Sequence, residues 1–113
     1  MQYALLVYTP ERDPERVTRP VPADLATLLD GPDVAGWVRL HVDESATTLR
    51  TDGGRTLLTD GPFIDSKEYL AGLIMIEVDD LDQALDVARE LQDARTRGAI
   101  EVRPIFEGNF RGA

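Results

Sequence analysis

A short segment of the chain places charged side chains of both signs around a tight turn. Asp60 begins the run Asp60-Gly61-Pro62-Phe63, and Lys67 and Glu68 follow it. Aspartate accepts backbone N–H groups in such turns, so Asp60 either caps this turn or presents a base, or a ligand for a cationic group, at a pocket mouth. Lys67, the only lysine of the chain, either clamps the loop against Asp60 or offers its ammonium group to an anionic substrate.

A second set of residues could bind ligand or move protons. His41 and Asp43 stand two positions apart on an expected strand, so their side chains can share a face and hydrogen-bond. His41 could equally be a surface or dimer-edge histidine. Phe63 is either a core or interface aromatic residue or a stacking platform, and Tyr8 ends its strand where it could line a cleft. Candidate catalytic residues are Asp60, His41 and Lys67, and candidate ligand-binding residues are Tyr8, Asp60, Phe63, Lys67 and Glu68.

Composition excludes several classes of site. The chain has no cysteine and one histidine, which argues against disulfides and against a zinc site, because zinc prefers several His or Cys ligands. We therefore expect no metal and no cofactor. The formal charge of −9 argues against nucleic acid. There is no long apolar run and no signal peptide, so we expect no membrane contact and a cytoplasmic location.

Hydrophobic patterns predict the elements that must position these side chains. At 113 residues the chain is expected to be a single domain over residues 1–113. Alternation and β-branched content predict strands, and Asp52-Gly53-Gly54 predicts a hairpin turn. The segment 70–78 is the most apolar and should be the central strand, with Gly72 at a close backbone or ligand approach. The predicted strands are residues 2–8, 37–42, 47–51, 55–59, 70–78 and 99–103.

Two helices are predicted, over residues 22–30 and 80–95. In the second, an apolar stripe recurs at helical spacing, and Asp80 followed by Gln83 resembles a capping box. The stripe consists of Leu81, Ala84, Leu85, Ala88 and Leu91. Residues 11–22 read as an exposed loop. This order predicts an α+β, ferredoxin-like sandwich with an antiparallel sheet. Since the first helix is short, apolar sheet surface would remain, and we expect a homodimer to cover it.

The residues of the loop and the segments around it resemble the DGPF group of YCII-related proteins. The resemblance rests on Thr59–Phe63, Ser66–Glu68, Gly72, Ile76–Ala84 and Ile100–Pro104, and it covers Ala46 to Glu107. It implies a dimeric α/β-barrel assembly of the ferredoxin-like type in a small bacterial protein. Members are often encoded near genes for alternative sigma factors, and most have no known activity.

The chain also departs from that family. Members typically have a longer first helix, and YCII enzymes are thought to use a His–Asp pair near it; this chain has no histidine there. Two hypotheses therefore stand. One is a binding or regulatory protein that holds a small ligand, which could be an anion, in a cleft near the DGPF loop. The other is a small-molecule enzyme with lyase or dehalogenase-like acid–base chemistry, which would use Asp60 or His41 with Lys67.

Overall fold

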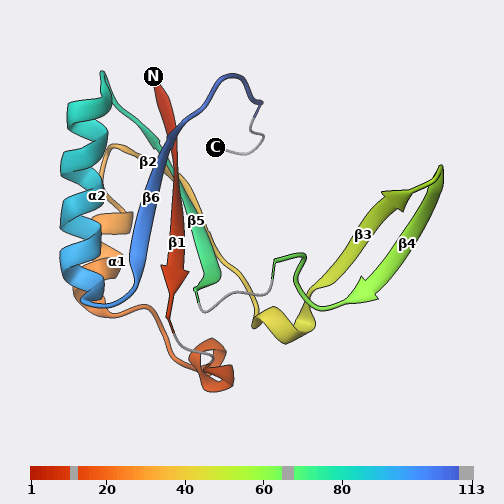
Figure 1. Ribbon diagram of the computed structural model, residues 1–113. Helices are drawn as coiled ribbons and strands as arrows, with labels where there is room; N and C mark the ends of the chain where they lie inside the picture. The colour runs from red at the N-terminus through yellow and green to blue at the C-terminus, as the bar shows by residue number, and fades with distance from the viewer. Residues whose placement is uncertain (11–12, 65–67, 110–113) are drawn as a thin grey trace.

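The computed structural model describes residues 1–10, 13–64 and 68–109, and within them an antiparallel sheet is covered by helices on one face (Figure 1). The sheet has the strand order β2-β5-β1-β6, and every neighbouring pair is antiparallel. Its strands are β1 (Gln2–Thr9), β2 (Val34–Arg39), β5 (Tyr69–Glu77) and β6 (Ala99–Pro104). This α+β architecture is the expected ferredoxin-like one, and β5 lies between β2 and β1, as predicted for the central strand.

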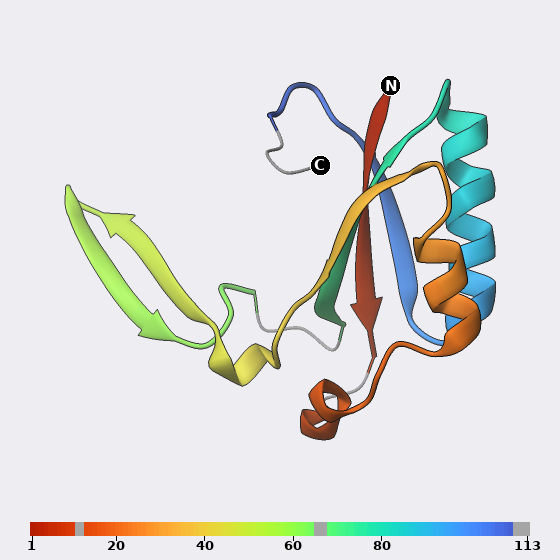
Figure 2. The ribbon, with the colours of Figure 1, turned by 180° about the vertical axis from the view of Figure 1, so that it is seen from behind.

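Helices α1 (Ala23–Leu29) and α2 (Leu81–Arg95) lie side by side against one face of this sheet (Figure 2). We name this the helix face and the opposite one the open face. Tyr3, Leu5 and Val7 of β1 point to the helix face and are buried. The alternate residues of β1, such as Leu6, are half-buried and point to the open face. Period-two alternation along β1 therefore separates the core from the open face.

Helix α2 begins as the capping box predicted. The Asp80 carboxylate accepts the N–H of Gln83 at 2.9 Å, and the Gln83 side-chain oxygen accepts the N–H of Asp79 at 3.0 Å. The predicted apolar stripe needs one correction. Ala84, Ala88 and Leu91 are buried, but Leu81 is 48% exposed, because it starts the helix beyond the edge of the core.

Strand β2 differs from the prediction for residues 37–42. It starts three residues earlier, at Val34, and ends at Arg39. A register shift between Val34 and Gly36 changes its pairing with β5, and the predicted alternation did not include it. Placing His41 on this strand was therefore wrong. The expected loop at residues 11–22 also contains a short 3-10 helix, η1 (Pro14–Thr18).

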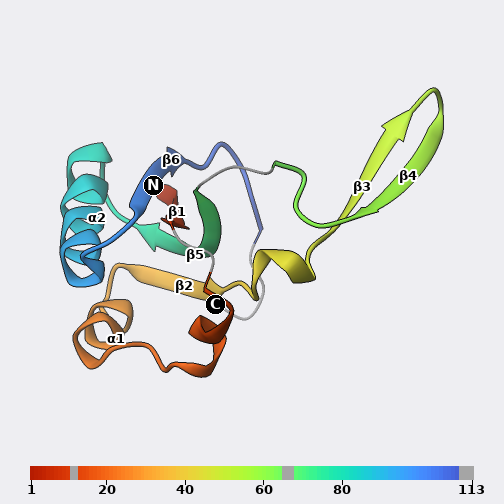
Figure 3. The same cartoon turned by 60° about the horizontal axis from the view of Figure 1, so that its bottom comes forward.

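The predicted hairpin forms, and it projects away from the sheet. Strands β3 (Thr47–Asp52) and β4 (Arg55–Asp60) pair only with each other among the described residues. Figure 3 shows them extending beyond the short 3-10 helix η2 (Asp43–Ser45). Leu49 is 66% exposed and Leu58 is 65% exposed. A lone two-stranded hairpin is marginally stable in water, so this arm presents apolar surface that its own domain does not cover.

Two glycines allow close approaches of backbone segments. A Cβ at Gly72 would lie 2.6 Å from the Val38 carbonyl oxygen, which confirms the close approach expected there. Gly98 has a φ of +72°, and a Cβ there would lie 2.1 Å from the Tyr8 carbonyl oxygen. Since Arg95 donates to that same oxygen at 2.9 Å, the end of α2 is fixed to the end of β1 at this point.

Gly98→Ala should lower the free energy of unfolding by more than about 2 kcal/mol. The methyl group would add left-handed strain and overlap the Tyr8 carbonyl. Gly36→Ala is the matched control, since a Cβ at Gly36 has no neighbour among the described residues within 4 Å. Urea denaturation of both variants measures the difference. Equal midpoints for the two variants would show that the contact at Gly98 does not constrain the fold.

Candidate functional site

A cavity of about 610 Å³ lies at the end of the open face where β1 ends and β5 begins. Tyr8 of β1 and Tyr69 and Leu70 of β5 form one side of it, and the segments that follow β2 and β4 form the rest. Its described lining consists of Tyr8, Leu40, His41, Val42, Asp43, Ser45, Ala46, Pro62, Phe63, Ile64, Glu68, Tyr69 and Leu70. We call this cavity the open-face pocket.

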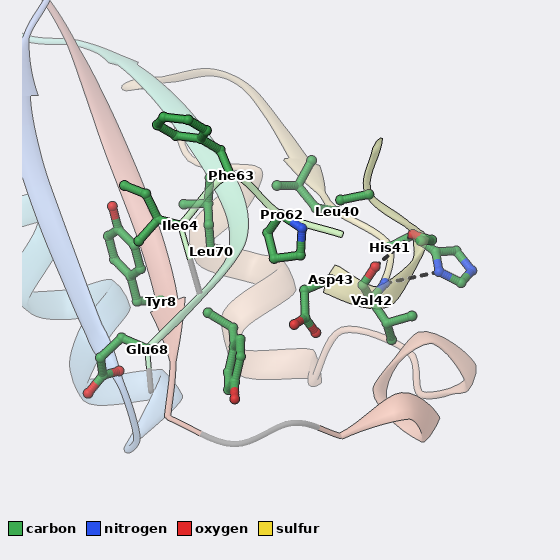
Figure 4. Close-up of a pocket in the computed structure, with 13 residues that line it drawn as sticks. Tyr8, Leu40, His41, Val42, Asp43, Pro62, Phe63, Ile64, Glu68 and Leu70 are labelled. Atoms are coloured by element: carbon green, nitrogen blue, oxygen red, sulfur yellow. Dashed lines mark hydrogen bonds between the residues drawn. The ribbon is translucent and has the colours of Figure 1, made fainter. Parts of the chain in front are cut away.

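The lining of the open-face pocket is mostly apolar, with a few polar groups among the aromatic and aliphatic side chains. Figure 4 shows the Asp43 carboxylate within the ring of lining residues, whereas the His41 imidazole lies at the outer edge. One carboxylate oxygen of Asp43 is shielded from solvent. An apolar cavity with few polar groups is typical of small-molecule sites.

The Tyr8 hydroxyl is positioned by the neighbouring strand. It donates to a carboxylate oxygen of Glu101 on β6 at 3.3 Å. Burial raises the pKa of Tyr8, and the charge and hydrogen bond of Glu101 raise it further, while Arg103 opposes them. Tyr8 is therefore a neutral hydrogen-bonding group at the wall of the pocket near neutral pH.

The histidine does not pair with Asp43 in the way the sequence suggested. The Nδ1 atom of His41 accepts the N–H of Val42 at 2.9 Å. Because β2 ends at Arg39, His41 lies in the connection to η2 rather than on a pleated strand. Both His41 and Asp43 still line the pocket, so the fold brings them to one site by a different route.

Asp60 lies at the end of β4 and is exposed, and it does not line the pocket. The bonds between described residues at this turn bypass its carboxylate: the Gly61 N–H donates to the Ala46 carbonyl at 2.7 Å, and the Thr48 hydroxyl donates to the Gly61 carbonyl at 2.7 Å. The expected cap by Asp60 is thus not found there. Lys67, which the prediction paired with it, lies outside the described residues.

Of the other predicted binding residues, Tyr8, Phe63 and Glu68 line the open-face pocket. Phe63 is 67% exposed, and the Arg50 guanidinium lies over its ring, 5.4 Å from the centroid. Sequence reasoning missed the aliphatic wall formed by Leu40, Val42, Ile64 and Leu70. The exposed apolar pair Phe63-Ile64 after a Gly-Pro turn was the available signal for part of it.

Asp60→Ala should change the free energy of unfolding by less than about 0.5 kcal/mol, because the carboxylate is exposed and holds no turn N–H in the described structure. Thr48→Val should cost about 1 kcal/mol, because the Gly61 carbonyl loses its hydroxyl donor. Chemical denaturation of both variants tests this. A larger loss of unfolding free energy for Asp60→Ala than for Thr48→Val would show that Asp60 does cap the turn.

The phenol of Tyr8 should ionise above its ordinary pKa of about 10. A raised folded-state pKa contributes stability that is present below the unfolded pKa and lost as pH rises through the folded one. Glu101→Gln should bring the Tyr8 pKa down, whereas Glu90→Gln, on the exposed side of α2, should leave it unchanged. NMR titration of the Tyr8 ring measures both. An unchanged value in Glu101→Gln would show that Glu101 does not hold this phenol.

In the described parts of the chain, neither α1 nor α2 combines the length and the apolar composition of a transmembrane helix.

Comparison with known proteins adds the family. The model of the YCII-related domain matches residues 1–109. An uncharacterized protein of Rhizobium meliloti (strain 1021) is 37% identical over 114 aligned positions, which cover 93% of this chain and 92% of that protein. The chain therefore belongs to the YCII-related family.

Proposed function

We propose that this YCII-related protein is a small cytoplasmic homodimer that binds a small, largely apolar ligand in the open-face pocket, in a regulatory or accessory role. The observation that carries the proposal is the pocket itself, because side chains from β1, β5 and two loops converge on one mostly apolar cavity. A volume of about 610 Å³ lies within the range of small-molecule sites.

The polar groups of the pocket indicate what the ligand would carry. Tyr8 and Ser45 offer hydroxyls, and Asp43 and Glu68 bring carboxylates, but no arginine or lysine is among the described lining residues. This lining suits an aromatic or aliphatic molecule with one hydrogen-bonding group. An anionic ligand at this loop would depend on Lys67, which lies outside the described residues.

Acid–base catalysis is the weaker candidate. Asp60 does not line the pocket, and the Nδ1 of His41 is engaged with the backbone of Val42. A catalytic base must reach the proton that it removes. The geometry of these two residues therefore favours binding over a reaction that they would drive.

A second copy of the chain would cover the open face. Val38 of β2 lies opposite Leu73 of β5, which in turn lies opposite Leu6 of β1, so these side chains form one apolar row on that face. Val38 is 51% exposed. Face-to-face packing of two such sheets would bury on the order of 1,000–2,000 Å² in total and would roof the open-face pocket.

Val38→Glu should convert the dimer to a monomer, because it places a carboxylate at the end of the apolar row, where the second copy would bury it. Leu81→Glu, at the exposed start of α2, changes an exposed leucine in the same way and should leave the dimer intact. Light scattering at micromolar concentration measures the mass. A monomer for the unmodified protein would contradict the proposed assembly.

Leu70→Trp should weaken binding of a neutral phenol such as p-cresol, because the indole would occupy part of the open-face pocket. Leu81→Trp, at an exposed position on α2, is the matched control and should bind as the unmodified protein does. Saturation-transfer NMR with circular dichroism reports binding and folding together. Undiminished binding by a folded Leu70→Trp variant would place the ligand elsewhere.

A further inference from the structure

A second cavity, of about 220 Å³, lies on the helix face of the sheet, at the same end as the open-face pocket. Val7 and Thr9 of β1 line it, while Tyr8 between them lines the open-face pocket. The apolar part of its wall comes from β1, β2, β5, α1 and the segment before α1, and includes Val7, Val21, Pro22, Leu25, Leu29, Trp37, Ala71, Gly72 and Ile74. We call this cavity the arginine pocket.

Three arginines among the described residues line the arginine pocket, and they come from distant parts of the chain. Arg16 lies in η1, Arg39 ends β2, and Arg95 ends α2. No carboxylate among the described residues lines this cavity. The chain as a whole has 21 acidic and 12 basic residues, so this concentration of positive charge runs against its overall balance.

Backbone carbonyls hold the three guanidinium groups in place. Arg16 donates to the carbonyls of Leu40 and His41, at 2.5 and 3.1 Å. Arg39 donates in return to the carbonyls of Arg16 and Arg19, both at 2.9 Å. These crossed bonds fix η1 to the end of β2. Neither guanidinium forms an ion pair with another residue of the described chain.

Arg95 is fixed in the same manner, by acceptors on β1 and α2. It donates to the Tyr8 carbonyl at 2.9 Å and to the Gln92 side-chain oxygen at 2.9 Å. A guanidinium has five N–H donors, and the Nε–H groups of Arg16, Arg39 and Arg95 have no hydrogen-bond partner in the described parts of the chain. The three groups thus retain donors for an incoming acceptor.

The electrostatics of the pocket disfavour the positive charges that it holds. Burial lowers the pKa of Arg16, and the charge of Arg39 lowers it further, against smaller opposing effects of Asp13 and Asp43. Burial also lowers the pKa of Arg95. The Asp13 carboxylate bonds Arg19. A bound anion would offset this desolvation and repulsion, since charge-assisted bonds to guanidinium groups are strong.

We propose that the arginine pocket binds a small organic anion, a carboxylate with an apolar body. The three guanidinium groups would contact the carboxylate, and the wall of Val21, Leu25, Leu29 and Ile74 would contact the body. The apolar wall favours this ligand over an inorganic anion, because an inorganic anion would not cover the wall and would leave its apolar surface exposed to water. This site is independent of the ligand proposed for the open-face pocket, which lies across the sheet.

The chain itself supplies a reporter for this pocket. Trp37 is the only tryptophan of the sequence, and it lines the cavity. Titration of the full-length protein with cyclohexanecarboxylate at low ionic strength should give a saturable change in tryptophan fluorescence. Cyclohexylmethanol and cyclohexylmethylammonium, which keep the body and change the charge, should give none. Inorganic phosphate should bind more weakly than cyclohexanecarboxylate.

Variants connect the signal to the arginines. Arg39→Gln should lower the affinity for cyclohexanecarboxylate about tenfold or more, as expected for the loss of charged hydrogen bonds. Arg39→Lys, which keeps the charge without the planar fork, should have intermediate affinity. Arg89→Gln removes an exposed arginine of α2 that pairs with Asp86 and should bind as the unmodified protein does. Circular dichroism confirms folding of each variant.

Several results would overturn the proposal. If the neutral alcohol bound as tightly as cyclohexanecarboxylate, the arginines would not be recognising charge. If phosphate bound more tightly than cyclohexanecarboxylate, the apolar body would not contribute to recognition. Equal weakening by Arg39→Gln and Arg89→Gln would assign the effect to net charge alone. If Arg39→Gln does not fold, the series of charged and neutral probes on the unmodified protein still decides the question.

Discussion

The arrangement of both cavities depends on β1 being held between β5 and β6 in one register. Successive side chains of a strand point to opposite faces, so Val7 and Thr9 reach the arginine pocket while Tyr8 reaches the open-face pocket. The register shifts between Val7 and Tyr8 in the pairing with β5. At this point the Tyr8 carbonyl oxygen accepts a hydrogen bond from the Arg95 guanidinium and lies close to Gly98. One backbone position therefore links the sheet, the end of α2 and both pockets.

Much of the fold followed from local sequence patterns, because these patterns carry their own physical cause. The apolar run at residues 70–78 is too apolar for an exposed segment, and it forms the central strand β5 (Tyr69–Glu77). Asp80 and Gln83 cap α2 through bonds that depend on their spacing alone. Glycines 53 and 54, which both have positive φ, turn the hairpin as expected.

Other features depended on contacts between distant segments, which one sequence does not display. Strand β2 ends at Arg39, which pairs with Gly72 of β5, so His41 lies beyond the paired segment. Asp60 looked like a turn cap, but the turn is closed by Gly61 with Ala46 and by Thr48. Arg16, Arg39 and Arg95 lie far apart in sequence and meet only after η1, β2 and α2 have packed. Their clustering therefore gave no signal in the sequence.

The open face is the surface on which the functional account depends, since it carries the apolar row and the larger cavity. An isotope-filtered NMR experiment on a mixture of labelled and unlabelled protein would test its burial directly. We expect nuclear Overhauser contacts between protomers from the methyl groups of Leu6, Val38 and Leu73. Intermolecular contacts confined to the outer surface of α2, or none at all, would contradict a dimer built on the open face.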